Sequence, residues 1–267
     1  MVIKERQMNI QFSVFTKSWT LPLPQLARLI RELGFDGIEL PVRPGYQVEP
    51  GHVGRDLGPA VKVLADAGLK IFSIAGPTDE VTLAACARAG IPIVRDCENI
   101  APGEKYWDAE MRIRMKYDAL LPLLEKHGIT LGIQNHYGDF IGHALGLLRL
   151  TAKYDPRRIA LVWDPAHSVL NGESPERAAE LLWDRVCMVN LKNGFFQRTS
   201  DSQAEYTQWR VNWTSARHGL TSWQHVAAEL KKRKYQGVIC LTAEYSDKNA
   251  LKELIAGDIA YAQALLG

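Results

Sequence analysis

A short unit that recurs along the chain constrains its fold more than any other feature. A helical segment ends in glycine and an apolar strand follows at once, as at Gly34 before FDGIEL, Gly68 before LKIFSIA, Gly90 before IPIVRD and Gly128 before ITLGIQ. Glycine readily takes the left-handed conformation that ends many helices. Strands that alternate with helices form right-handed βαβ units and a parallel sheet. The chain is therefore predicted to be an α/β protein.

The number of strands favours a closed barrel. Eight segments have the apolar character of strands: 10–16, 37–41, 70–75, 91–95, 129–134, 158–164, 186–192 and 237–244. Eight strand–helix units favour a (β/α)8 TIM barrel over an open sheet, and such barrels have roughly 250 residues. No linker rich in Pro, Gly or Ser divides the chain, so residues 1–267 are predicted to form one TIM-barrel domain. Neither GxGxxG after the first strand nor GxxxxGK[ST] is present, which disfavours the main nucleotide-binding folds.

Composition narrows the classes of function. The chain has 32 Lys and Arg against 30 Asp and Glu, a net charge of +2, which argues against a dedicated binder of nucleic acid or of a membrane surface. No apolar run is long enough to span a bilayer, and MVIKERQMNI at the N-terminus is not a secretory signal. The four cysteines form no CxxC pair. We expect a cytoplasmic protein without disulfides.

The alternation of side chains along each strand predicts a polar site at one end of the barrel. Successive strand residues point to opposite faces. If Ile159, Leu161 and Trp163 face the helices, Asp164 points into the barrel mouth. The same alternation turns five more polar residues inward: Glu39, Gln134, Asn190, Lys192 and Glu244. Active sites of such barrels lie at the C-terminal ends of the strands. We predict a ligand-facing site; the alternative is that these side chains hydrogen-bond one another and fill the barrel top.

The segments LGIQNH, WDPAH, VNLKN and ICLTAEY, which hold these residues, resemble the strand-end motifs of the xylose-isomerase-like barrel superfamily. The resemblance covers nearly the whole chain. The superfamily includes sugar isomerases, sugar epimerases, inositol-catabolism enzymes and AP endonucleases of the endonuclease IV type. The resemblance thus implies a xylose-isomerase-like TIM barrel that acts on a sugar or polyol.

The resemblance also implies a divalent-metal site, but this sequence departs from the pattern. Epimerase-like members hold the metal with an early Glu, the Asp of WDxxH, the His of HxKD and a late Glu. Asp164 and Glu244 match two of these ligands, whereas Gln134 replaces the early Glu and Asn190 replaces the His. Amide oxygens bind hard cations without the charge of a carboxylate. Two interpretations stay open: weakened binding of Mn, Mg or Zn by these four residues, or a polar sugar pocket without a metal, in which Lys192 neutralises the carboxylates.

The chemistry of the superfamily assigns roles to the same residues. Its isomerases and epimerases remove a proton next to a carbonyl, and epimerisation by two bases needs a carboxylate on each face of the carbon. Gln134 cannot accept that proton, so Glu244 is the predicted acid–base residue and symmetric two-base epimerisation is disfavoured. His167 and Lys192, which match the family's flanking histidine and lysine, are the other predicted catalytic residues. Asn193 replaces the Asp of HxKD.

Further binding residues are expected in two long loops, 41–56 and 193–220, that follow strands at the same rim. The predicted substrate-binding residues are Gln134, His136, Arg43, Trp213 and Arg217. Arg43 either grips an anionic or polyhydroxyl substrate or anchors its loop, and Lys17 has the same ambiguity. Segment 205–223 is aromatic and basic, which is typical both of a substrate lid and of an interface in a homodimer. Both interpretations stay open.

Three functions follow from these features. The first is an isomerase, epimerase or related lyase that acts on a ketose, keto-sugar or polyol. The alternative is a catalytically silent sugar-binding or regulatory barrel, since two family ligands are replaced. The third, an AP endonuclease, ranks last because the strand ends near Glu39, Ala75 and Arg95 offer no histidines for a trinuclear zinc site, and the net charge attracts phosphate weakly.

Overall fold

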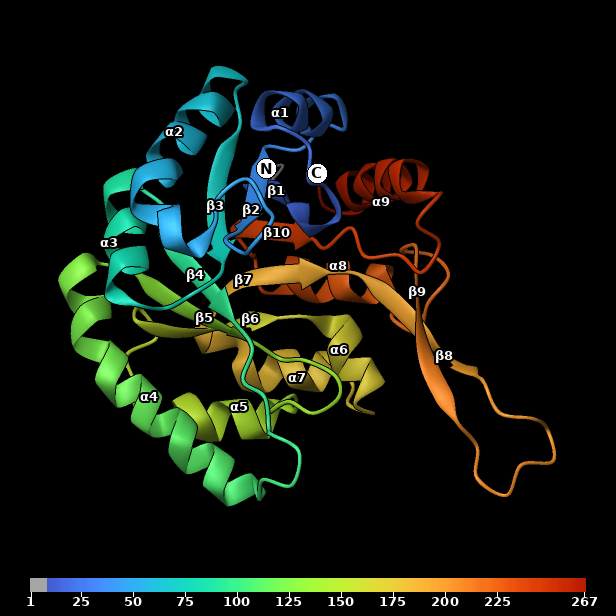
Figure 1. Cartoon of the computed structure of the whole chain (residues 1–267). Helices are drawn as coiled ribbons and strands as arrows, with labels where there is room; N and C mark the ends of the chain where they lie inside the picture. Colours follow the sequence, from blue (N-terminus) through green and yellow to red (C-terminus); the bar gives the residue numbers. More distant parts are fainter. Residues whose placement is uncertain (1–8) are drawn as a thin grey trace, which may run out of the picture.

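Eight parallel strands close into a barrel in a computed structural model of the chain, which describes residues 9–267 (Figure 1). Around the barrel the strands follow the order β1-β10-β7-β6-β5-β4-β3-β2. They are β1 (Ile10–Phe15), β2 (Gly37–Pro41), β3 (Lys70–Ala75), β4 (Ile93–Asp96), β5 (Thr130–Gln134), β6 (Ile159–Trp163), β7 (Val186–Leu191) and β10 (Gly237–Leu241). The predicted (β/α)8 fold is confirmed.

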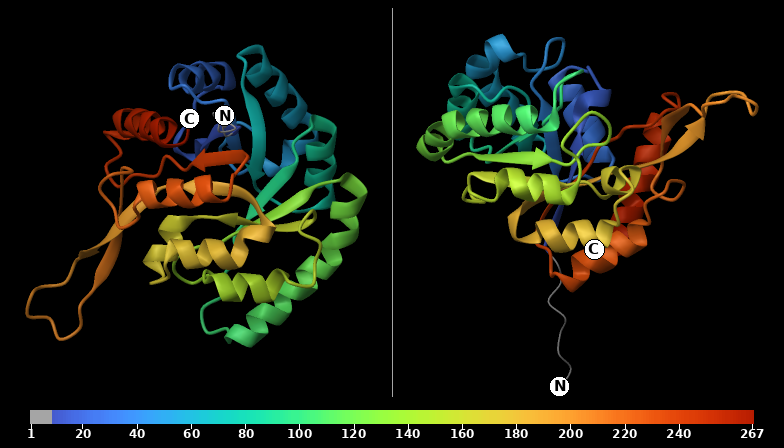
Figure 2. Two further views of the ribbon diagram at one scale, coloured as in Figure 1. Left: turned by 180° about the vertical axis from the view of Figure 1, so that it is seen from behind. Right: turned by 90° about the horizontal axis from the view of Figure 1, so that it is seen from below.

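Helices surround the barrel in the described part of the chain (Figure 2). They are α1 (Leu23–Glu32), α2 (Val53–Asp66), α3 (Glu80–Ala89), α4 (Tyr106–His127), α5 (Ala144–Thr151), α6 (Pro165–Leu170), α7 (Pro175–Leu182), α8 (Trp223–Lys232) and α9 (Leu251–Leu266). Short 3-10 turns lie at Thr16–Ser18, Pro50–His52 and Trp183–Arg185. The glycines of the recurring unit end helices as expected: Gly90 and Gly128 cap α3 and α4 with φ of 71° and 67°. None of these helices has the length and apolar character needed to cross a bilayer.

Two separate apolar clusters confirm the predicted alternation. Ile159, Leu161 and Trp163 of β6 belong to the large cluster that also contains buried residues of the surrounding helices. Val162 of the same strand belongs to a second, smaller cluster with inward residues of other strands, such as Met188. The sheet therefore sorts its side chains into a layer under the helices and a barrel interior. Polar residues of the inward parity consequently lie inside the barrel or at its rim.

The predicted strand 237–244 is too long. β10 ends at Leu241, and Ala243 has a φ of 49°, which is not an extended conformation. This turn, unusual for a residue with a side chain, redirects the backbone just before Glu244. Strand 91–95 likewise begins later, at Ile93.

The prediction of a loop over residues 193–220 is wrong in part. β8 (Asn193–Arg198) and β9 (Trp209–Thr214) pair antiparallel and form a hairpin that projects from the barrel (Figures 1 and 2). Its base is fixed by Ser246, whose backbone N–H donates to the Trp213 carbonyl at 2.9 Å, while its hydroxyl accepts from the Trp213 N–H at 2.9 Å. The other predicted loop, 41–56, contains the turn Pro50–His52 and the first residues of α2.

Candidate functional site

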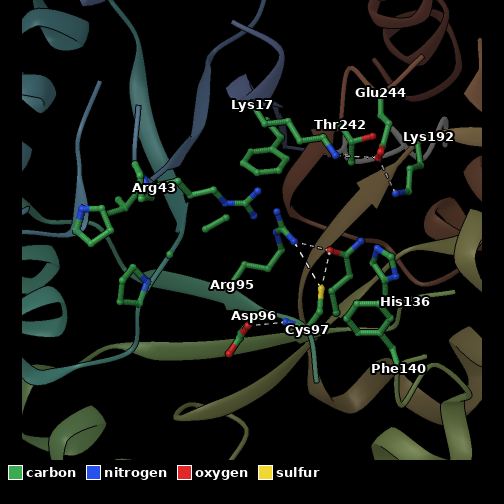
Figure 3. Close-up of a pocket in the computed structure, with 18 residues that line it drawn as sticks. Lys17, Arg43, Arg95, Asp96, Cys97, His136, Phe140, Lys192, Thr242 and Glu244 are labelled. Atoms are coloured by element: carbon green, nitrogen blue, oxygen red, sulfur yellow. Dashed lines mark hydrogen bonds and ion pairs between the residues drawn. The ribbon is translucent and has the colours of Figure 1, made fainter. Parts of the chain in front are cut away.

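A cavity of about 570 Å³ opens at the C-terminal ends of the strands. Its wall includes the last residues of several strands, Phe15, Ala75, Asp96 and Gln134 among them. Charged side chains line it from several directions: Lys17, Arg43, Arg95, Asp96, Lys192 and Glu244 (Figure 3). Three of the six polar residues predicted to point inward line this cavity, which has a size suited to a small molecule: Gln134, Lys192 and Glu244.

Glu244 lies between two ammonium groups. Its Oε2 is 3.0 Å from Nζ of Lys17 and 3.1 Å from Nζ of Lys192 (Figure 3). Burial alone would raise the pKa of Glu244, but the charges of Lys192 and Lys17 outweigh it and lower the pKa to about 2. Burial in turn lowers the pKa of Lys17, against the opposing attraction of Glu244. The carboxylate is thus ionised and shared by two cations.

Asp164 is fully buried and does not line the cavity. Its Oδ1 accepts the backbone N–H groups of Ala166 at 3.1 Å and His167 at 3.3 Å, which caps the first turn of α6. Its Oδ2 accepts an N–H of the Gln134 side chain at 2.8 Å. Burial raises the pKa of Asp164 to about 6, although the nearby charge of Lys192 lowers it. Both carboxylate oxygens are therefore already bound by N–H donors.

Gln134 connects Asp164 to a buried ion pair. Its side-chain carbonyl accepts from Nη1 of Arg95 at 2.6 Å. Arg95 in turn holds the fully buried Glu39 through Nη2 at 2.7 Å and Nε at 2.8 Å, and Ser73 donates its hydroxyl to Glu39 at 2.8 Å. This chain of contacts fixes which end of the Gln134 amide faces Asp164. Glu39 thereby supports a neighbouring side chain.

Sequence reasoning did not find Arg95 as a site residue, although a signal was present. Arg95 shares the parity of Ile93, and Ile93 lies in the interior cluster. An arginine that points into a barrel must find a buried anion, and Glu39 is the inward acid two strands away. The alternation of side chains, which was applied to the other strands, would have predicted this ion pair if it had been applied to residues 93–95.

Two histidines stack beside the cavity. The rings of His136 and His167 have centroids 4.0 Å apart, and His136 lines the cavity with Phe140, whose ring centroid is 4.3 Å away. Burial lowers the pKa of His136 to about 4. His167 is fully buried, its Nδ1 accepts the Tyr137 N–H at 3.0 Å, and burial lowers its pKa well below the usual range. Both imidazoles are therefore neutral near pH 7.

Several buried polar atoms near the site have no hydrogen-bond partner among residues 9–267. They include both side-chain atoms of Asn190, Nε2 of His167 and the hydroxyl of Thr242. Asn190 is fully buried, and its partner in the β7–β10 register is Cys240, a residue of the interior cluster. Unpaired buried polar groups are costly. Water or a ligand hydroxyl that reaches this layer would relieve that cost.

Of the other residues singled out in the sequence, one contacts the site and two lie away from it. The Trp213 ring packs over the Lys192 ammonium, 4.3 Å from Nζ to the ring centroid, which links the hairpin to the site. Arg217 does not line the cavity; its guanidinium lies 3.6 Å from the ring centroid of Tyr261 in α9. Asn193 donates to the carbonyls of Ala216 and Thr221, both at 2.8 Å, and so holds the chain near the hairpin base.

The donor set does not fit a divalent cation. No group of three or more His, Cys, Asp or Glu side chains in the described range is arranged to hold a metal. Gln134 presents an N–H to Asp164, and its carbonyl is taken by Arg95. Oε2 of Glu244 is taken by two ammonium groups. Ammonium groups thus occupy the positions around Glu244, and neutral N–H groups occupy those around Asp164.

Comparison with known proteins gives the same architecture. A family model described as "Xylose isomerase-like TIM barrel" matches residues 27–264. No curated protein sequence matches the chain. Among solved structures, 3-keto-D-glucoside 4-epimerase from E. coli in its apo form is similar at a TM-score of 0.72 and 12% identity, over 96% of this chain and 100% of that chain.

Two further structures show the range of similar proteins. D-psicose 3-epimerase from Clostridium cellulolyticum H10, with D-tagatose, has a TM-score of 0.74 and 10% identity over 96% of this chain and 99% of its own. A probable 3-DHS dehydratase from Bacillus anthracis has a TM-score of 0.70 and 16% identity over 95% and 98%. At such identities the likeness shows the fold alone. The chemistry must be argued from the cavity.

Proposed function

The chain belongs to the xylose isomerase-like TIM barrel family, and we propose that it moves a proton next to the carbonyl of a sugar or keto-polyol, without a divalent metal. The observation that carries this proposal is the Glu244 carboxylate, which faces the cavity between the ammonium groups of Lys17 and Lys192. A base and two positive charges at one place are the parts that enolisation needs.

Lys17 and Lys192 act as the electrophile that polarises the substrate carbonyl. Removal of a proton next to a carbonyl leaves negative charge on the carbonyl oxygen, and fixed cations stabilise that charge. Lys17 and Lys192 reach the same carboxylate oxygen, so a substrate oxygen placed beside Glu244 lies within reach of both. As the substrate draws the ammonium groups away, the pKa of Glu244 rises from about 2, and the carboxylate becomes a better base.

A single base favours isomerisation over epimerisation. Epimerisation by two bases needs a proton acceptor on each face of the carbon, whereas one carboxylate can move a proton between adjacent carbons on one face. Gln134 stands where the family pattern has a second carboxylate, and its amide N–H is directed at Asp164. We therefore propose an interconversion of aldose and ketose type, in which Glu244 carries the proton between the two carbons. Lys17 or Lys192 gives a proton to the carbonyl oxygen and takes one back from the neighbouring hydroxyl.

A catalytically silent sugar-binding protein is the second candidate. The observation that favours it is that Asp164 is bound by three N–H donors, is fully buried and does not line the cavity. A pocket in which the Glu244 carboxylate is already paired with two lysines binds hydroxyl groups without any need for turnover. The two candidates differ in whether a bound sugar exchanges a C–H proton with solvent.

Proton exchange tests the proposal directly. The protein is incubated in D2O with D-fructose, D-tagatose and D-psicose, and proton NMR follows loss of the C–H signals next to the carbonyl. We expect exchange with at least one ketose and a drop of about 100-fold or more in Glu244→Gln. Glu253→Gln, an exposed position in α9, is the matched control and keeps the rate. Sugar binding without exchange would instead support the silent candidate.

A further inference from the structure

Three cations gather around one aromatic ring on the wall of the cavity. The Phe15 ring centroid lies 5.6 Å from Nζ of Lys17, 5.5 Å from the guanidinium carbon of Arg43 and 4.8 Å from that of Arg95. Figure 3 shows the labelled side chains of Arg43, Arg95 and Lys17 converging on the cavity. They come from the loop after β2, from β4 and from the 3-10 turn after β1. Cation–π contacts of this kind are favourable, but they do not cancel the repulsion among like charges.

These cations are not all compensated. Arg95 is neutralised by Glu39, whereas Lys17 and Lys192 share the single charge of Glu244. Arg43 has no carboxylate within ion-pair distance anywhere in residues 9–267.

Asp96 is a second acid on the wall among the described residues. Asp96 is held by Lys116 of α4 at 2.7 Å, and Lys116 also binds Glu98 at 2.9 Å. Asp96 and Glu98 thus share one cation, so the charged groups around the cavity have a net excess of one positive charge.

Hydrogen bonds and close packing fix the position of the loop that carries Arg43. The Val42 N–H donates to the Ala75 carbonyl at 3.0 Å, and the Tyr46 hydroxyl donates to the Lys17 carbonyl at 2.8 Å. A Cβ on Gly76 would come within 2.7 Å of Val42, so the loop lies directly against the end of β3. These contacts connect the loop of Arg43 to the end of β3 and to the backbone of Lys17. The Arg43 side chain remains exposed to a ligand that enters the cavity.

We infer that the substrate of the proposed reaction carries an anionic oxygen group, a carboxylate or a phosphate, that binds Arg43 beside Phe15. The inference rests on the proposed function. Lys17 and Lys192 stabilise the enediolate, and Arg43, which has no carboxylate partner among residues 9–267, remains for an anion of the substrate itself. A planar guanidinium that lacks an ion-pair partner matches the two oxygens of a carboxylate or phosphate. The ligand class is thus a sugar acid or a sugar phosphate.

Three sugars that differ only at carbon 6 test this inference: D-glucose, D-glucuronate and D-glucose 6-phosphate. Binding to the full-length protein is measured by isothermal titration calorimetry at low salt. We expect one or both anions to bind about tenfold or more tightly than D-glucose. Preference for D-glucuronate identifies a carboxylate as the natural group, and preference for D-glucose 6-phosphate identifies a phosphate.

Arginine variants separate direct contact from general attraction. Arg43→Gln should remove the preference for the anion, and Arg43→Lys should keep part of it because the charge remains without the planar fork. Arg31→Gln, an exposed arginine of α1, changes the net charge equally and should keep the full preference.

Two results would overturn the inference. Equal affinity for the neutral and both anionic sugars, together with proton exchange on neutral ketoses, removes the anion site and leaves the proposed function intact. Absence of binding by all three sugars, together with absence of exchange, removes both.

Discussion

At the scale of single residues, Gln134 determines the character of the site. Its N–H binds Asp164 and its carbonyl binds Arg95, so neither carboxylate chemistry nor metal ligation is available to it without the loss of both contacts. The sequence showed that Gln stands where the family pattern has Glu, but it did not show which contacts hold the amide in place. One of these contacts is with Arg95, which supplies the positive charge next to the amide.

The pair of Arg95 and Glu39 makes a prediction about stability. Arg95→Met leaves the fully buried Glu39 without a cation, and the free energy of unfolding in urea should fall by about 3–5 kcal/mol. The double variant Glu39→Gln with Arg95→Met removes the buried charge as well, so it should recover much of that loss. Equal stability of the two variants would show that the buried charge is not the cause.

Asp164 makes a prediction about pH. Its pKa is about 6 in the folded protein, above its usual 3.8, so between these values the folded state binds more protons than the unfolded chain. Its contribution to stability is present at low pH and is lost as the pH rises through 6. The unfolding free energy of the wild type relative to Asp164→Asn should therefore fall from pH 4 to pH 7, by up to about 3 kcal/mol. Parallel pH profiles for the two proteins would contradict this.

At the scale of elements, the barrel was predictable and the hairpin was not. Helix–glycine–strand units mark the barrel strands because each must bury an apolar face. β8 and β9 pair with each other outside the barrel, their outer halves are exposed, and no two-residue turn signal such as Asn-Gly joins them. The residues of the cavity wall were only partly predictable. The alternation along a strand gives the direction of each side chain. It does not give the strand register or turns such as that at Ala243, which decide which side chains meet at the rim.

The outer end of the hairpin is predicted to be dispensable for the fold. Replacing residues 199–208 with Asn-Gly keeps the base, where Trp213 contacts Lys192, and removes chain that is exposed except at the half-buried Ser200. The free energy of unfolding should change by less than about 1 kcal/mol. Trp213→Ala should weaken sugar binding with little effect on stability. A large loss of stability in the shortened chain would mean that the hairpin tip makes stabilising contacts and is not dispensable.

The same shortened chain tests the two interpretations of segment 205–223. Gel filtration with light scattering gives the mass of the wild type and of the variant. A dimer that dissociates on shortening supports the interface, and an unchanged mass with weaker sugar binding supports the lid.

At the scale of the whole molecule, the organisation of residues 1–267 as one domain stays a prediction. Tyr206 at the hairpin tip is 78% exposed, so limited chymotrypsin treatment should cut after it. The fragment 207–267 contains β10, which is hydrogen-bonded between β1 and β7 of the closed barrel. The two fragments should therefore elute together in gel filtration and separate only in denaturant. Release of the smaller fragment under native conditions would contradict a single unit.

The central claim is that Glu244 with Lys17 and Lys192, rather than a metal, carries the proton transfer. The decisive measurement is the rate of C–H exchange in D2O for a responsive ketose, before and after dialysis against EDTA and again with added Mn²⁺. We expect the same rate in all three conditions, within about twofold, since the fixed ammonium groups replace metal-ion stabilisation. Loss of exchange with EDTA and its return with Mn²⁺ would show that a metal carries the reaction.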